Sequence, residues 1–290
     1  MTYEQDSYAS HAKHIDGIEN SLERLEKQQS IDYWRHERMY NLLLPLIKEK
    51  HRWLTVGDGM GTDANWLMKK GLDVTASDIS DTALRKAKES NYITAYSREN
   101  AEKIGFEDNS FDYILCKEAY HHFPRPYVAL YEMIRVSRKA IVLIEPVDIG
   151  IEMPLFICLK KVLDRISPTC IDKVWKNRYS FETVGNYVYK TSEREFEKLA
   201  MGLNLPCIAF KGINDYYSPS LNLSLPPTKN KVFARVKRKI RRRNFLCWLG
   251  LIPYQLQASI VFKETPSAEI LQGLKKEGYK VIQLKRNPYA

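Results

Sequence analysis

Between residues 53 and 145, short apolar runs alternate with amphipathic stretches. The runs have the length of buried strands, expected at 53–56, 72–77, 92–96, 112–116 and 140–145. The stretches between them have helical spacing, with helices expected at 63–70, 80–90 and 126–137. Parallel strands need long crossover connections, which helices usually supply. The alternation therefore predicts an α/β fold with a doubly wound, mostly parallel sheet and helices on both faces.

The rest of the chain is expected to add a cap and insertions to this core. Residues 1–50 show helical spacing and are expected to form an N-terminal cap. The main domain is expected to span 51–263, with its last strands at 206–211 and 258–263. Within it, 150–190 is expected to be a substrate or lid insertion and 212–256 a basic amphipathic insertion. Residues 264–290 indicate a helix-strand extension.

The cysteines and the N-terminus indicate a cytoplasmic protein. The five cysteines are widely spaced, so neither a disulfide framework nor a metal site is expected. The first residues are polar and acidic, unlike a signal peptide. The longest apolar run, 245–254, is far shorter than the roughly 20 residues that a membrane-spanning helix needs.

A glycine-rich loop follows the first of these strands. Gly57, Gly59 and Gly61 lack side chains, so the backbone can turn tightly and a ligand can approach it closely. Thr62 stands where a pyrophosphate-binding loop has its third glycine, which favours a nucleoside cofactor without phosphate. Asp78, 21 residues after Gly57, ends the next strand and can accept hydrogen bonds from ribose hydroxyls.

Several stretches together resemble the class I S-adenosylmethionine-dependent methyltransferases, in the small-molecule branch that includes quinone-pathway and sugar methyltransferases. The matching stretches are 53–61, 74–80, 100–112, 114–123, and 132–135 with 140–145, of which 100–112 is the most specific. The resemblance covers about residues 35–211. It implies a Rossmann-like sheet of seven strands in the order 3-2-1-4-5-7-6, with the last strand antiparallel, and a cofactor at the carboxyl ends of strands one to four.

The resemblance also implies which residues bind S-adenosylmethionine. The loop residues would line the methionine moiety, Asp78 the ribose and Ile79 the adenine, with two residues beside the adenine amino group; the full set is Gly57, Asp58, Gly59, Gly61, Asp78, Ile79, Asn100 and Ala101. Lys117 or Glu118, with Arg35 or Arg38, would hold the charged methionine end. Thr55 and Asn100 stand where the family usually has acids, which keeps open a cofactor-binding protein without catalysis.

Candidate catalytic residues follow the fourth and fifth strands. Proton removal from a hydroxyl acceptor accelerates its methylation, and histidine is a common base for this step. In related sugar O-methyltransferases a histidine and an acid at these positions act as a pair, which implies His121 or His122 with Glu145. The alternative is structural: one histidine packs against a helix, and Glu145 closes its strand.

Most of the net charge of +10 lies in one segment. Nine Lys or Arg and no acid occur between residues 229 and 243, with an apolar stripe at helical spacing and an apolar run, 245–253, behind them. Such a segment suits an anionic membrane surface or an acidic glycan substrate. Nucleic acid is disfavoured, because stacking aromatics are not interleaved with the basic residues. The alternative is a solvated basic face on a helix that packs on the sheet or on the second subunit of a homodimer.

The leading hypothesis is a cytoplasmic methyltransferase, peripheral on the inner face of the membrane, that O-methylates a sugar or lipid-linked glycan in envelope polysaccharide biosynthesis. One alternative is N- or C-methylation of a small molecule or quinone-like lipid. Another is RNA modification through the basic helix.

Overall fold

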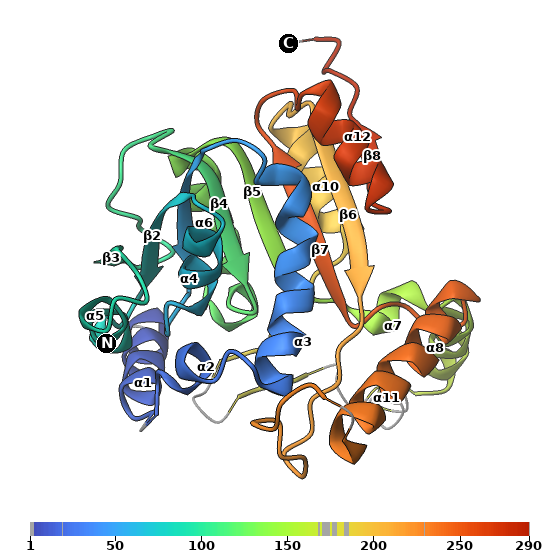
Figure 1. The fold of residues 1–290 in the computed structure, drawn as a ribbon. Coiled ribbons are helices and arrows are strands. Elements are labelled where there is room, and N and C mark those ends of the chain that lie inside the picture. The colour runs from blue at the N-terminus through green and yellow to red at the C-terminus, as the bar shows by residue number, and fades with distance from the viewer. Residues whose placement is uncertain are drawn as a thin grey trace.

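The computed structural model describes residues 3–18, 20–167, 169, 175, 179–182, 186–228 and 230–289. Within them eight strands form one sheet with helices on both faces (Figure 1). The strands are β1 (Arg52–Val56), β2 (Asp73–Asp78), β3 (Ala95–Arg98), β4 (Phe111–Lys117), β5 (Ser137–Pro146), β6 (Cys207–Ile213), β7 (Leu256–Phe262) and β8 (Lys280–Gln283).

The helices of the N-terminal half are α1 (Tyr3–Asp16), α2 (Glu23–Glu26), α3 (Ile31–Tyr40), η1 (Asn41–Leu46), α4 (Thr62–Lys69), α5 (Thr82–Glu89), η2 (Tyr120–His122) and α6 (Pro126–Val136). Those that follow are α7 (Ile149–Glu152), α8 (Pro154–Ile166), α10 (Glu193–Gly202), α11 (Lys231–Trp248) and α12 (Ala268–Lys276). The α/β architecture expected from the alternation is confirmed.

The strand order is β3-β2-β1-β4-β5-β7-β6-β8. Its first seven positions have the expected order, and β7 is antiparallel to both β5 and β6. The predicted sheet had one strand too few, because β8 of the C-terminal extension pairs antiparallel with β6 and continues the sheet.

The expected start of the third strand was wrong by three residues. Asn91 adopts a left-handed conformation (φ 59°) after the end of α5. The N–H of Tyr92 then donates to the carbonyl of Ala87, the hydrogen bond of a helix C-cap. Residues 91–94 are therefore used to leave the helix, and β3 begins at Ala95.

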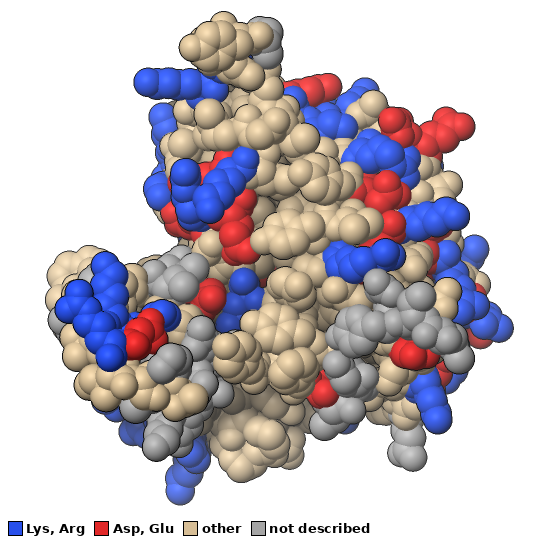
Figure 2. All heavy atoms as spheres, turned by 180° about the vertical axis from the view of Figure 1, so that it is seen from behind, with Lys and Arg blue, Asp and Glu red and all other residues tan. Residues whose placement is uncertain are grey.

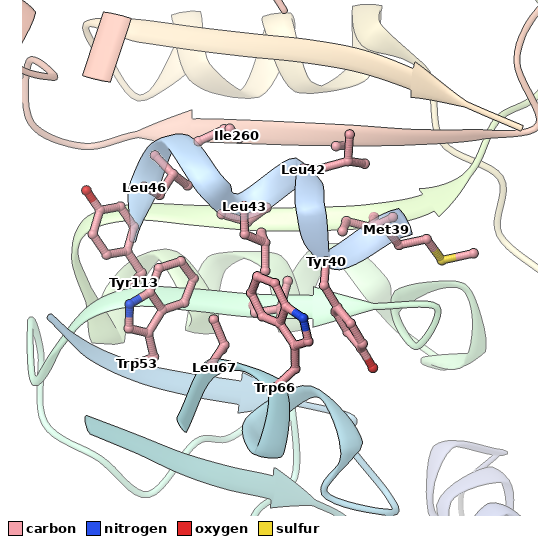
Figure 3. Close-up of a cluster of buried hydrophobic side chains, with 14 of the residues drawn as sticks. Met39, Tyr40, Leu42, Leu43, Leu46, Trp53, Trp66, Leu67, Tyr113 and Ile260 are labelled. Carbon is pink, nitrogen blue, oxygen red and sulfur yellow. The ribbon is translucent and has the colours of Figure 1, made fainter. Parts of the chain in front are cut away.

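The sheet separates two apolar layers because alternate side chains of a strand point to opposite faces. Trp53 faces a layer made with α3, η1 and α4, whereas Leu54 faces the layer of α6 and α10. In the first layer the ring of Trp53 stacks on Tyr113 at 4.7 Å, and Tyr40 stacks on Trp66 at 5.3 Å (Figure 3). The segment expected to be a cap therefore contributes α3 and η1 to the core itself.

The parallel strands β1, β2 and β4 end at one edge of the sheet, and α1 and α2 lie beside that edge (Figure 1). Because β5 and β6 both run antiparallel to β7, β6 is parallel to β5 and ends at this edge too. The segments leading to α8 and α11 therefore start from the same edge. No helix in the described part of the chain is long and apolar enough to cross a membrane.

Two neighbouring leucines of η1 test the packing of the first layer. Leu43 is completely buried, whereas Leu44 is 39% exposed. Leu43→Ala is expected to lower the free energy of unfolding by about 2–5 kcal/mol, because a cavity replaces the side chain. Leu44→Ala serves as the matched control and is expected to cost less than about 1 kcal/mol. Urea denaturation measures both, and equal losses would contradict this description of the core.

Candidate active site

A cavity of about 480 Å³ opens at the carboxyl ends of β1, β2 and β4. Its lining comes from the glycine loop, the residues after β2 and β4, the helices α1 to α3, and the residues Glu182, Asn186 and Tyr217. Widely separated parts of the chain therefore meet at the place where the sequence predicts a cofactor.

Two of the three loop glycines line this cavity. Gly57 has a positive φ of 74°, and a Cβ there would lie 2.4 Å from the Cβ of Ala119. A Cβ on Gly59 would lie 3.3 Å from Oδ2 of Asp78, so the glycine keeps that carboxylate open to the cavity. Gly61, also at positive φ, is outside the lining and packs against Ile93 at the start of α4.

Asp58 lines the cavity, but its carboxylate bonds to its own loop and helix. Oδ1 accepts from the N–H of Asp63, and Oδ2 accepts from the N–H of Ala64 and the hydroxyl of Thr55. Asp58 thus caps α4, and Thr55 is its partner. Burial, reinforced by the charge of Asp63, raises the pKa of Asp58 to about 8.

Asp78 and Ile79 lie together in the cavity wall at the end of β2. Oδ1 of Asp78 accepts from the N–H of Ser80 at 3.1 Å. Burial raises the pKa of this carboxyl to about 6. A buried carboxylate that faces open space is poised to accept further hydrogen bonds from a ligand.

The segment after β3 contributes Glu99 and Ala101 to the lining, whereas Asn100 is not part of it. Oδ1 of Asn100 accepts from the N–H of Glu102 at 2.8 Å. The side chain of Asn100 is therefore used in its own turn, and Ala101 is the residue of this predicted pair that borders the cavity.

Lys117 and Glu118 bring charge to the cavity at the end of β4. Nζ of Lys117 lies 3.2 Å from Asp63 Oδ1 and 3.7 Å from Glu118 Oε2. Burial disfavours its charge, but the two acids outweigh burial and raise the pKa of Lys117. Glu118 has a positive φ of 52°, a strained conformation for a non-glycine residue and a frequent feature of functional sites. The pKa of His36, beside Lys117, is lowered well below its usual value by burial and that cation.

Arg35 of α3 lines the cavity, whereas Arg38 does not. Arg35 bonds to Asp32 at 3.0 Å and to both carboxylate oxygens of Asp215. Arg38 instead donates to the carbonyl of Asn214, with its guanidinium over the ring of Trp34. Of the two arginines expected from the sequence, only Arg35 lines the cavity.

The two histidines after β4 have different surroundings. His121 is buried outside the cavity lining, with Nδ1 2.6 Å from Glu145 Oε2. Burial opposes its charge, but Glu145 outweighs burial and raises the pKa of His121. His122 lines the cavity, and its Nδ1 lies 2.7 Å from Oε2 of Glu182. The histidine that reaches the cavity is thus paired with Glu182 and not with Glu145.

Helix α1 covers the cavity with one face. Its ring and aliphatic side chains there recur at helical spacing, namely Tyr8, His11, His14 and Ile15. The ring of His11 lies 5.4 Å from that of His122, and burial lowers the pKa of His11 to about 4. Ser7 donates to Asn186, which joins α1 to the segment of Glu182.

Sequence reasoning missed several lining residues that carry chemistry, namely Tyr8, His11, Arg24, Asp32 and Glu182. The spacing of Tyr8, His11 and Ile15 was a signal for one functional face on α1. Nothing local marks Glu182, because tertiary packing alone brings it to His122. Within the described residues no group of three or more His, Cys, Asp or Glu could hold a metal ion.

Residues 54–144 match the family model of a methyltransferase domain. The match runs from β1 to β5 and contains the glycine loop, Asp78 and both histidines. This part of the chain is a methyltransferase domain. No curated protein sequence matches the chain significantly.

Solved structures share the fold at low sequence identity. One is 1,6-didemethyltoxoflavin-N1-methyltransferase of Burkholderia thailandensis with bound 1,6-didemethyltoxoflavin and S-adenosylhomocysteine: 11% identity, 91% of this chain and 92% of that chain covered, TM-score 0.53. Another is in the complex of the Haloferax volcanii Trm112 methyltransferase activator with a methyltransferase: 13% identity, 91% and 99% covered, TM-score 0.52.

The pKa of Asp78 gives a test of its role. In the folded protein the carboxyl group of Asp78 stays protonated up to about pH 6, whereas the ordinary pKa of an aspartate is 3.8. The charged carboxylate therefore opposes folding, and its contribution to stability falls as the pH rises from about 4 through 6. At pH 7, Asp78→Asn is expected to stabilise the cofactor-free protein by on the order of 2–3 kcal/mol. The same change should weaken S-adenosylhomocysteine binding roughly 10- to 100-fold.

Thermal unfolding without cofactor and calorimetric titration with S-adenosylhomocysteine measure these two effects. Asp73→Asn is the matched control, since Asp73 is the exposed first residue of β2 and its ion pair with Arg52 spans 3.7 Å. Both values should stay unchanged in the control. Full cofactor affinity in Asp78→Asn would contradict the assignment of this residue to the cofactor.

Proposed function

We propose that this methyltransferase methylates a hydroxyl group of a small polar acceptor, such as a sugar unit of a glycan, with His122 as the general base. The observation that carries the proposal is the pair of His122 and Glu182 in the cavity wall. When bound, S-adenosylmethionine supplies an electrophilic methyl group. The protein must then align the acceptor and remove its proton.

The cavity fits the cofactor at both of its ends. Asp78 and Ile79 would hold the ribose and adenine, because Gly59 leaves the buried Asp78 carboxylate open. Arg35 and Lys117 offer positive charge to the methionine carboxylate, and Glu118 offers negative charge to its ammonium group. The residue types present therefore match a nucleoside joined to an amino acid.

His122 is suited to accept a proton from an acceptor hydroxyl. Its Nδ1 faces the carboxylate of Glu182, which leaves Nε2 for the acceptor. The negative charge of Glu182 stabilises the imidazolium that forms when the proton arrives, as the carboxylate does in other histidine–carboxylate pairs.

His121 and Glu145 lie outside the cavity lining and contact the segment that carries His122. Glu145 Oε1 accepts from the N–H groups of Ala119 and Tyr120 at 2.9 and 3.0 Å, and its Oε2 meets His121. The rings of His121 and His122 lie 3.9 Å apart. We assign His121 and Glu145 as positioning residues that hold the segment carrying the base.

Two features favour a sugar as the acceptor. The lining beyond the glycine loop is rich in hydrogen-bonding side chains, including Tyr8, His14 and Asn186, which suit hydroxyl groups. Tyr217 at the cavity is exposed and offers an aromatic face against which Arg35 already packs at 5.2 Å. The volume is that of a small-molecule site, so a longer glycan would enter by one unit.

His122→Ala is expected to lower kcat roughly 100- to 10,000-fold, because the acceptor proton loses its base. Cofactor affinity should stay near that of the wild type, since the Asp78 end is untouched. Release of S-adenosylhomocysteine, followed over a panel of nucleotide sugars, glycolipids, phenols, amines and RNA, measures turnover. Calorimetry measures cofactor binding.

Glu182→Gln should show a smaller loss in the same direction, because Gln keeps the shape and removes the charge. His51→Ala is the control, since His51 is a buried histidine at the opposite, amino end of β1. It should leave kcat unchanged below its melting temperature. Full turnover in His122→Ala, or an amine or RNA as the preferred acceptor, would refute O-methylation with this base.

A further inference from the structure

The apolar stripe of α11 that the sequence shows is used inside the protein. Phe233, Val236 and Ile240 are buried and pack with Ile31 and Leu223. The ring of Phe233 meets Trp34 edge to face at 4.9 Å. The inner face of α11 is therefore fixed to the fold, and only its outer face is available to a partner.

The outer face of α11 is basic along most of its length and apolar at its end. The exposed residues opposite the buried stripe follow one another three or four positions apart, namely Lys231, Arg235, Arg238, Arg242, Phe245 and Leu249. No Asp or Glu occurs between residues 216 and 263. Among the described residues, none of these outward cations forms an ion pair, so their charge is free to act outward.

The carboxyl end of α11 exposes a group of large apolar side chains, Phe245, Trp248, Leu249 and Leu251. Trp248 is 76% exposed, and its ring stacks on Phe245 at 6.0 Å. The surface of a soluble protein rarely exposes so much adjoining apolar area unless a partner binds there.

Helix α8 provides a second, independent apolar stripe. Leu159, Val162 and Ile166 are exposed at spacings of three and four, with Lys161, Asp164 and Arg165 exposed between them. The segments leading to α8 and α11 both leave the carboxyl edge of the sheet, and both helices lie at one end of the molecule (Figure 1). Elsewhere the charges are mixed, and on the face in Figure 2 acidic and basic side chains are interspersed over the upper part of the body.

We propose that the outer face of α11, its apolar end and the exposed stripe of α8 dock on an anionic lipid surface. The cations attract acidic headgroups, and tryptophan with leucine partitions into the boundary between headgroups and acyl chains. This goes beyond the methylation reaction and does not depend on it. Because the cavity opens at the same edge, docking would bring the cavity close to acceptors held in the membrane.

Lipid explains the surface better than the two other partners. RNA would use the cations and could stack on Trp248 or Phe245, but the exposed Leu and Ile side chains have no ring on which a base could stack. A second copy of this chain would bring two uncompensated basic faces together, which repel each other.

The test is co-sedimentation of the full chain with phosphatidylcholine vesicles that contain or lack phosphatidylglycerol. The wild type should bind the anionic vesicles, and binding should weaken as salt is added. The triple variant Arg235→Gln, Arg238→Gln, Arg242→Gln should bind them roughly 100-fold more weakly. The emission of Trp248 should shift to the blue on binding, and Trp248→Phe should remove that shift.

The control variant removes the same charge elsewhere, by changing the exposed Lys275, Lys276 and Lys285 to Gln. It should bind vesicles like the wild type, and circular dichroism should show that both variants are folded. Equal vesicle binding by both triple variants would overturn the proposal. The proposal would also be overturned if the wild type does not bind the anionic vesicles. This holds whether the wild type instead binds an RNA oligonucleotide at matched salt or self-associates in sedimentation.

Discussion

The buried carboxylate of Glu145 determines the shape of the active site. Through one oxygen it accepts from two backbone N–H groups after β4, and through the other it meets His121. Hydrogen bonds to a charged group contribute about 1.5–3 kcal/mol each, enough together to offset the cost of burying one carboxylate. This carboxylate fixes Ala119, whose Cβ occupies the space that Gly57 leaves open. The glycine loop and the segment of His122 are thereby held against each other.

Two further carboxylates are buried at the cavity at some cost to stability. Asp58 and Asp78 both have raised pKa values, so their charged forms oppose folding at neutral pH. Asp58 is compensated within the fold, because Thr55 and the first amides of α4 bond to it. Asp78 accepts fewer bonds and faces open space, which is the pattern of a group whose remaining partners belong to a ligand. The contrast explains why two aspartates at the ends of the neighbouring strands β1 and β2 have different roles.

The fold was largely predictable because its information is local. Strand and helix lengths follow from hydrophobic period, and the strand order followed from the resemblance carried by 53–145. The β3 start was missed because the left-handed turn at Asn91 lies in a sequence that also has strand character. The strand β8 was expected only as an extension, since nothing in residues 280–283 shows that they pair with β6.

The site was predictable only where its residues come from that local core. The glycine loop, Asp78 and the segment of His121 and His122 are encoded next to their own strands. Glu182 reaches His122 through a segment whose path depends on contacts far along the chain, such as the bond of Ser7 to Asn186. Arg38 was a reasonable expectation from one helical turn, but Arg35 is the residue that α3 presents to the cavity.

The amphipathic pattern of the basic segment is interpreted differently once the structure shows which side of α11 is buried. From the sequence, the basic run together with the apolar run behind it suited an anionic membrane surface, and a helix packed on the sheet was the alternative. In the structure the apolar stripe packs on Ile31 and Leu223, so it orients the helix and leaves the cations outward. A helix anchored in this way cannot roll to bury its basic face. Its outward charge and its apolar end are therefore a permanent property of the folded enzyme, held at the same edge of the sheet as the cavity.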